Sequence, residues 1–136
     1  MKPSAVAQLV ADTLSSLSVD DPLFEGADLP VSIGPRRAHT SRRNVEILPQ
    51  VPERLPNSLD RCSYRMEIEV RYFFPSAGTS KAYLSGLDDG LSLHNTLEEL
   101  SSNSEIDAVQ VDGGRITEIG ENELEVFLLA TVDFQN

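Results

Sequence analysis

The residues best suited to a specific chemistry are four arginines, Arg36, Arg37, Arg42 and Arg43, which lie within eight residues that contain no acid. A guanidinium binds carboxylates and phosphates through two parallel hydrogen bonds. The segment contains no aromatic side chain, so it lacks the stacking platform of single-stranded nucleic-acid binders. The sequence therefore predicts contacts with an acidic surface of a neighbouring copy, with an acidic partner or with DNA that passes nearby. The alternative is a solvated loop without a partner.

Other side chains that could take part in catalysis are few and lie apart in the sequence. Cys62 is the one cysteine, and His39 and His94 are the two histidines. Asp88 and Asp89 are adjacent, but neighbouring residues on a helix point about 100° apart, so helix capping or solvation explains them better than a shared site. No spacing is typical of a metal site, an activated nucleophile or a phosphate loop. We therefore expect no catalytic residue, no cofactor and no metal, and we expect Cys62 to be a structural thiol.

Charge is distributed unevenly along this acidic chain, whose formal net charge is −11. Residues 36–71 hold eight arginines against five acids, net +3, whereas residues 72–136 hold twelve acids against Lys81 and Arg115, net −10. So acidic a chain repels nucleic acid, which argues against general DNA binding. A basic and an acidic segment can attract copies of the chain head to tail, and such contacts close into rings or extend into filaments. An arbitrary placement of charge on a solvated surface is the alternative.

The longest predicted element is a strand over residues 61–74. Apolar side chains alternate there with charged or polar ones, which is the period of a strand with one buried and one exposed face. At about 3.3 Å per residue it would run roughly 43 Å, against roughly 37 Å for the width of a compact domain of this length. We therefore expect this strand either to bend or to project from its own fold and require a partner.

The pattern of elements predicts a single α+β domain over residues 1–136, in which two helices pack against a mostly antiparallel sheet. We also expect a protruding Arg-rich hairpin loop and, because of three prolines, an extended connection over residues 49–60. The expected helices cover residues 3–18 and 80–100. The expected strands cover residues 28–34, 44–48, 61–74, 106–111 and 123–134.

The second helix carries a stripe of residues at helical spacing. Its members are Leu84, Leu87, Leu91, His94, Leu97 and Leu100. Such a stripe is typical of the face that a helix packs against its neighbours. Gly86 and Gly90 weaken the helix and predict a kink or a break. Further along, Asp112-Gly113-Gly114 is typical of a tight turn between strands.

Composition places further bounds on the protein. A single cysteine cannot form an internal disulfide, and polar residues interrupt the opening segment too often for a signal peptide. No stretch reaches the length needed to span a bilayer. We expect a soluble intracellular product without membrane contact.

The order and texture of the elements resemble the tail terminator, or tail completion, proteins of long-tailed bacteriophages and related neck proteins. The resemblance covers nearly the whole chain: the helix PSAVAQLVADTL, the strand DLPVSIGP, a Pro- and Arg-rich excursion, the strand YRMEIEVRYFF, the helix NTLEEL and the strand ELEVFLLATVDF. It implies a single α+β domain that forms a homohexameric ring, stops polymerisation of the tail tube and offers a surface for the head. It implies no catalytic residue.

We therefore expect a non-enzymatic virion protein of the tail or neck that assembles in the host cytoplasm. Its expected partners are copies of itself, the tail tube protein and a neck or connector protein, with DNA only passing through the pore. The expected self-interface combines arginines of the loop and long strand with acids near the last strand. These residues are Arg36, Arg37, Arg42, Arg43, Arg61, Arg65, Arg71, Glu121, Glu123 and Glu125.

Three alternatives remain open from the sequence. A head–tail connector or baseplate component would share the architecture. A module that binds a small ligand would use a cavity between sheet and helices, lined by Tyr64, Met66, Tyr72 and Tyr83. A hydrolase would lose activity on mutation of Asp88 or His94.

Overall fold

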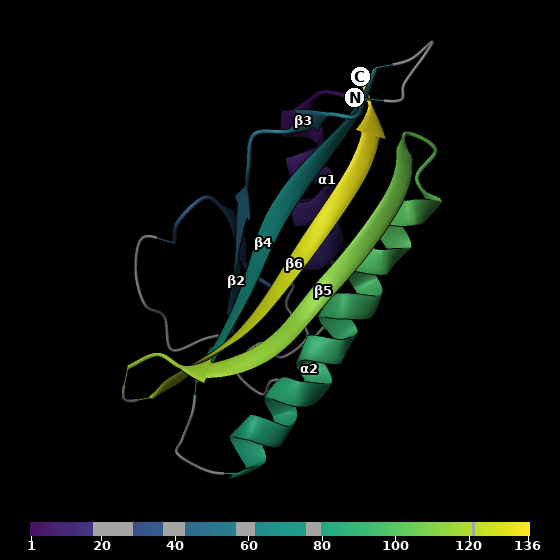
Figure 1. Cartoon of the computed structure of the whole chain (residues 1–136). Coiled ribbons are helices and arrows are strands. Elements are labelled where there is room, and N and C mark those ends of the chain that lie inside the picture. The colour runs from purple at the N-terminus through teal and green to yellow at the C-terminus, as the bar shows by residue number, and fades with distance from the viewer. Residues whose placement is uncertain (18–28, 37–42, 57–61, 76–79, 121) are drawn as a thin grey trace.

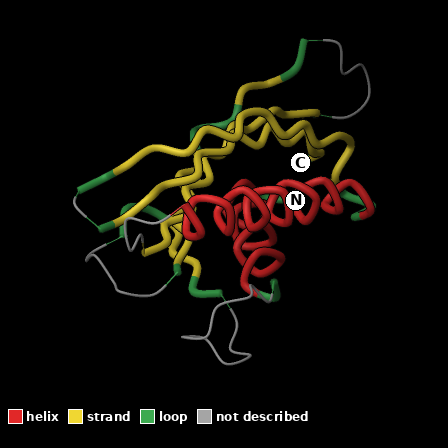
Figure 2. Tube along the Cα trace, turned by 90° about the horizontal axis from the view of Figure 1, so that it is seen from below, coloured by secondary structure: helices red, strands yellow, loops and turns green. Residues whose placement is uncertain are grey.

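The computed structural model describes residues 1–17, 29–36, 43–56, 62–75, 80–120 and 122–136. Within them the chain forms a six-stranded sheet and two α-helices, α1 (Pro3–Ser15) and α2 (Ser80–Glu98) (Figure 1). Both helices lie on the same side of the sheet (Figure 2). The two termini meet, and the Met1 ammonium donates a hydrogen bond of 2.7 Å to the Gln135 carbonyl. The predicted α+β class is confirmed.

The sheet has the strand order β1-β2-β4-β6-β5, and β3 also pairs with β4. All described pairs are antiparallel except that of β1 with β2. The strands are β1 (Val31–Ile33), β2 (Asn44–Pro49), β3 (Glu53–Arg54), β4 (Ser63–Pro75), β5 (Ile106–Glu118) and β6 (Glu123–Gln135), and a 3-10 helix, η1 (Glu99–Ser102), follows α2.

Strand β4, the long predicted strand, is central in the sheet. It pairs with β6 along its whole length, from Ser63 opposite Gln135 to Pro75 opposite Glu123, while β2 and β3 pair with its other edge. Its alternate apolar side chains from Met66 to Phe74 are buried on the helix side, and Phe73 is buried on the opposite face under Arg36. Of the two outcomes expected for this strand, bending or projecting from the fold and requiring a partner, the second is wrong, because β6 is equally long and pairs with it along its whole length within the chain.

The sequence predicts that β1 and β2 are the two arms of a hairpin. That prediction is wrong. The two strands pair in parallel, with Val31 opposite Val45 and Ile33 opposite Ile47. Gly34 has a φ of 92°, which glycine adopts without strain, and its N–H donates a hydrogen bond of 2.8 Å to the Ile47 carbonyl. The Arg-rich segment therefore connects two parallel strands, and residues 37–42 within it lie outside the described residues.

The glycine pair at 113 and 114 lies inside β5 rather than in the predicted turn. Gly113 and Gly114 have φ angles of 94° and 128°, and the pairing with β6 shifts register between Gly113 and Arg115. This is a β-bulge, which bends a strand and increases its local twist. A Cβ on Gly113 would lie 3.2 Å from the Phe127 carbonyl oxygen, so the bulge also brings the two backbones close together. The chain turns toward β6 later, near Gly120.

Helix α1 confirms the predicted opening helix, although it ends at Ser15 rather than near Ser18. Pro3 lies in its first turn, where a fixed φ suits the helix and the missing N–H costs nothing. Its buried residues recur at helical spacing and are Val6, Ala7, Val10, Ala11 and Leu14.

Helix α2 runs unbroken through both of its glycines, and it turns a different face to the sheet from the one predicted. The residues of α2 and η1 that are buried are Gly86, Asp89, Leu93, Leu97 and Leu100. Leu97 and Leu100 were thus assigned correctly to the core face. Leu84, Leu87 and Leu91 instead remain 60 %, 49 % and 61 % exposed.

The cause of this rotation is close contact between α2 and the sheet at its glycines. A Cβ on Gly86 would lie 2.2 Å from Phe74 Cζ, and a Cβ on Gly90 would lie 3.2 Å from Val126 Cγ1. The two glycines are four residues apart and therefore share one side of the helix. They give up roughly 1 kcal/mol of helix propensity each, and in return the helix backbone covers the fully buried ring of Phe74.

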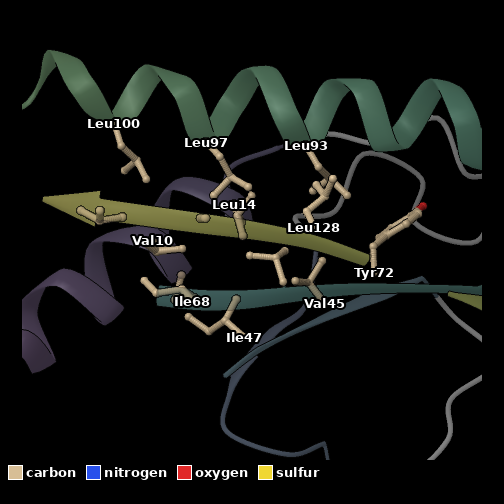
Figure 3. Close-up of a cluster of buried hydrophobic side chains, with 14 of the residues drawn as sticks. Val10, Leu14, Val45, Ile47, Ile68, Tyr72, Leu93, Leu97, Leu100 and Leu128 are labelled. Atoms are coloured by element: carbon tan, nitrogen blue, oxygen red, sulfur yellow. The ribbon is translucent and has the colours of Figure 1, made fainter. Parts of the chain in front are cut away.

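The core fills the space between the sheet and the two helices (Figure 3). Leu93, Leu97 and Leu100 point toward β6, and Val10 of α1 and Ile68 of β4 belong to the same buried cluster. All five side chains are at most 4 % exposed. One continuous cluster therefore joins both helices to the sheet.

The contact of Gly86 with Phe74 is tested by Gly86→Ala. Alanine gains about 1 kcal/mol of helix propensity, but displacing a buried ring costs about 1–3 kcal/mol. We expect the free energy of unfolding in urea to fall by roughly 1 kcal/mol. On a Phe74→Leu background, which removes the ring, the same substitution should be neutral or stabilising. An equal loss on both backgrounds would show that the ring does not set the position of α2.

Candidate interaction surface

Arg36 is held within its own chain by three kinds of contact. Its Nη2 and Nη1 donate hydrogen bonds of 2.6 and 3.0 Å to the two carboxylate oxygens of Glu123. Its backbone N–H donates to Glu46 Oε2 at 2.8 Å. The guanidinium lies over the ring of Phe73, 3.5 Å from the centroid, which adds a cation–π contact. A bidentate pair of this kind fixes the start of the Arg-rich segment on the sheet.

Arg43, at the other end of that segment, pairs with the buried carboxylate of Asp89. Its Nη1 donates to Asp89 Oδ2 and to the Tyr72 hydroxyl, and its Nη2 donates to Ser85 Oγ at 3.1 Å. The Tyr72 hydroxyl also donates to Asp89 Oδ2 at 2.6 Å, and Figure 3 shows this hydroxyl pointing toward α2. The network ties β2, β4 and α2 together, so the interpretation of Asp89 as a cap or a solvated residue is wrong.

Burial raises the pKa of the Tyr72 phenol, and the hydrogen bond to the ionised Asp89 raises it further. Both effects disfavour a second negative charge in this network. The raised pKa keeps Tyr72 protonated, and a hydrogen-bond donor to Asp89, at pH values where an ordinary phenol has begun to ionise.

Arg65 and Arg71 pair with acids on the side of the sheet away from the helices. Arg65 donates to both carboxylate oxygens of Asp133, its cross-strand neighbour, at 2.8 and 3.0 Å. The guanidinium nitrogens of Arg71 lie 3.3 Å from a carboxylate oxygen of Glu69, 3.7 Å from one of Glu125 and 3.9 Å from one of Glu46. The carboxylate of Asp133 raises the pKa of the Arg65 guanidinium above its already high value.

Six residues of the expected self-interface thus pair within the chain. They are Arg36, Arg43, Arg65, Arg71, Glu123 and Glu125. The other four, Arg37, Arg42, Arg61 and Glu121, lie outside the described residues. Ion pairs between the basic and the acidic segment therefore form, at least in part, within one copy of the chain. A further role of these residues between copies stays a prediction.

A different surface emerges from the helix. Leu84, Leu87 and Leu91, which we call the leucine ridge, lie on α2 together with Tyr83, which is 46 % exposed. Leu84 precedes the buried Leu93 by nine residues, which is two and a half turns, so the two side chains point to opposite sides of the helix. Helix α2 is therefore apolar toward the sheet and also apolar toward solvent.

A pocket of about 210 Å³ lies beside the leucine ridge, between α2, β5 and β6. Its walls are Leu87, Leu91 and His94 of α2, the bulge glycines of β5 and apolar side chains of both strands. His94 supplies a polar wall, with Nδ1 3.6 Å from Glu98 Oε1. The volume is below the roughly 300–1,000 Å³ of ligand sites, so the pocket suits one apolar side chain better than a whole ligand.

The cavity expected for a ligand-binding module does not form at its predicted place. Met66 and Tyr72 are packed in the core, Tyr64 stacks on Phe134 at 6.0 Å between centroids, and Tyr83 is exposed on α2. The bulge and the two helix glycines create the pocket elsewhere. The sequence shows the spacing of these glycines, but it does not show that α2 and β5 bring them together around one pocket.

Three further observations bear on function. Among the described residues, no three His, Cys, Asp or Glu side chains come together as a metal site. In the same part of the chain, no helix is long and apolar enough to cross a membrane. Neither a protein-family model nor a curated protein sequence matches this chain.

The Arg43–Asp89 pair is tested by Asp89→Ala. Removing one partner leaves a buried guanidinium without its charge partner, which costs about 3–5 kcal/mol of unfolding free energy. The matched control is Asp133→Ala, which breaks the more exposed pair with Arg65 and should cost far less, because solvent screens that pair. Chemical denaturation of both variants measures the difference, and equal losses would contradict the buried role of Asp89.

The pKa of Tyr72 gives an alkaline test. The unfolded phenol ionises near its ordinary pKa of about 10, whereas the folded one resists ionisation, so the contribution of Tyr72 to the unfolding free energy is constant below that pH and falls above it. Tyr72→Phe should remove this part of the fall, while the exposed control Tyr83→Phe should keep it. Urea unfolding across the alkaline range measures the slope. Identical slopes for wild type and Tyr72→Phe would refute the assignment.

Proposed function

We propose that this chain is a non-enzymatic structural subunit of a bacteriophage tail, a tail terminator whose copies form a hexameric ring. The ring caps the tail tube and provides the surface that joins it to the head. Its partners are copies of the same chain, the tail tube protein and a neck or connector protein. The protein acts in the virion after assembly in the host cytoplasm.

The leucine ridge is the observation that carries the assembly role. Three leucines and a tyrosine on one helix are about half exposed or more, next to an apolar pocket. Monomeric proteins rarely leave contiguous apolar patches of more than a few hundred Å² in water, and larger ones mark interaction sites. Burying such a surface against another protein gains about 25 cal/mol for each Å² removed from water. A subunit of a larger assembly has this property.

The open edges of the sheet support a ring. In the described sheet, β1 forms one edge with three residues and β5 forms the other with thirteen. Rings with one rotation axis are built from contacts between two unlike patches, and two unlike sheet edges on opposite sides of a subunit suit that arrangement. The order of helices and strands that carries the resemblance to tail terminators is also the order found in the fold.

The net charge of −11 suits a ring through which DNA passes. Phosphates are repelled by an acidic surface, so DNA is not retained by the protein during passage. Two arginines that could bind phosphate, Arg36 and Arg43, lie at the two ends of the Arg-rich segment. Glu123 and Asp89 neutralise them. This supports passage of DNA rather than its binding.

Native mass spectrometry of the purified protein tests the proposal. We expect a single closed oligomer whose mass is a multiple of six chains. The apolar part of the assembly should persist at about 1 M salt, where charges are screened within about 3 Å. Adding the oligomer to growing tail tubes should stop their elongation. A protein that is monomeric at every concentration and salt would overturn the proposal.

A further inference from the structure

We propose that the leucine ridge binds a second copy of itself, with the two α2 helices antiparallel about a two-fold axis near Leu84. This inference rests on the proposed function, because it names the partner of the surface that carries it. Leu84, Leu87 and Leu91 are spaced by three and four residues. That spacing produces the narrow seam by which one helix packs against another, so a helix is the shape that fits the ridge.

The charges beside the ridge are those that an identical helix requires. Lys81 and Asp88 are both exposed and lie seven residues apart, nearly two full turns, so they flank the ridge on one line. In an antiparallel pair, Lys81 of each copy meets Asp88 of the other, which gives two reciprocal ion pairs. A two-fold contact must be complementary to itself in this way. The midpoint between positions 81 and 88 places the axis beside Leu84.

The charges on α2 also explain why a second copy of this acidic chain can approach the leucine ridge. The acidic and basic residues of α2, apart from the buried Asp89, are Lys81, Asp88 and, at the last position, Glu98. Lys81 and Asp88 cancel, so the part of α2 around Leu84 carries no net charge although the chain as a whole has a net charge of −11. Two copies can therefore meet at this place without the repulsion that opposes contact elsewhere.

The pocket beside the ridge supplies a place for an aromatic anchor. In the antiparallel pair, Tyr83 of the second copy lies at the level of Gly86 along the helix axis, and helical side chains lean toward their own N-terminus. Its ring therefore leans toward Leu87 and Leu91, the ridge residues that line the pocket. A cavity of about 150 Å³ is enough to hold benzene in another protein, so about 210 Å³ accommodates this ring. Aromatic anchors in such pockets carry much of the energy of protein contacts.

The symmetry of this contact separates it from the contacts within a ring. Neighbours around a single rotation axis meet through two different patches, whereas the α2 contact uses the same patch twice. The α2 pair therefore joins two rings face to face. The free protein should then contain twice the number of chains that one ring holds.

Cysteine cross-linking locates the axis. On a Cys62→Ser background, Leu84→Cys should form a disulfide between two copies on mild oxidation, because each residue 84 faces its counterpart. The matched control is Leu91→Cys on the same background. It lies six to seven residues from the axis, so its two copies are about 20 Å apart at 1.5 Å per residue and cannot be bridged. A disulfide at position 91, or none at position 84, would overturn the two-fold arrangement.

Charge exchange tests the identity of the partner. Lys81→Glu alone and Asp88→Lys alone should each weaken pairing on the order of tenfold, since two ion pairs become two repulsions. The double variant Lys81→Glu/Asp88→Lys restores opposite charges only if the partner is a second copy, and should return pairing to the wild-type level. Failure of the double variant to recover while the ridge is still needed for assembly would assign the ridge to a different protein.

Native mass spectrometry of ridge variants separates this inference from the proposed function. Leu87→Asp should halve the mass of the assembly and leave single rings, whereas Val51→Asp, at an apolar residue 89 % exposed outside α2, should leave the mass unchanged. An unchanged mass for Leu87→Asp, or its collapse to monomers, would overturn the pairing of rings and leave the ring itself standing. A monomeric wild-type protein would overturn both proposals.

Discussion

The contact between the backbone of Gly86 and the ring of Phe74 determines which face of α2 lies on the sheet and which face remains in solvent. No larger residue fits there, because a Cβ would lie 2.2 Å from the ring. With this side of α2 on the sheet, Asp89 lies inside next to Tyr72 and Arg43, and the leucines at 84, 87 and 91 point outward. One steric constraint thus produces both the buried ion pair and the exposed apolar surface. A helix with alanine at this position would have to withdraw or rotate.

The ionic contacts hold the two ends of the Arg-rich segment in place. Arg36 is anchored to β6 through Glu123, and Arg43 is anchored to α2 through Asp89. Buried pairs of this kind contribute little net stability, because desolvation offsets much of the attraction, but they penalise any arrangement in which one partner is missing. Their main effect is to specify where the connection between β1 and β2 begins and ends. The largest exposed apolar side chains of α2, at Leu84, Leu87 and Leu91, take no part in these ionic contacts.

Sequence periodicity was sufficient for the elements that obey one local rule. The alternation along β4 and the helical spacing in α1 each follow from burial of one face, and both elements form where expected. The rotation of α2 was not predictable, because the leucine spacing of its first half matches a core face and the ring that excludes a Cβ at Gly86 is twelve residues away in sequence. The Arg43–Asp89 pair spans 46 residues, and no local pattern reveals such a distance. The parallel pairing of β1 with β2 likewise depends on the path of the intervening chain and not on either strand alone.

The central claim is that the outward leucines of α2 are covered by another copy of the chain. Hydroxyl-radical footprinting of the assembled protein measures this directly, residue by residue. Leu84, Leu87 and Leu91 should be protected from oxidation in the assembly and should react once it is diluted to single chains, whereas Val51 should react equally in both states. Oxidation of the three leucines in the intact assembly at the rate seen in single chains would contradict the account.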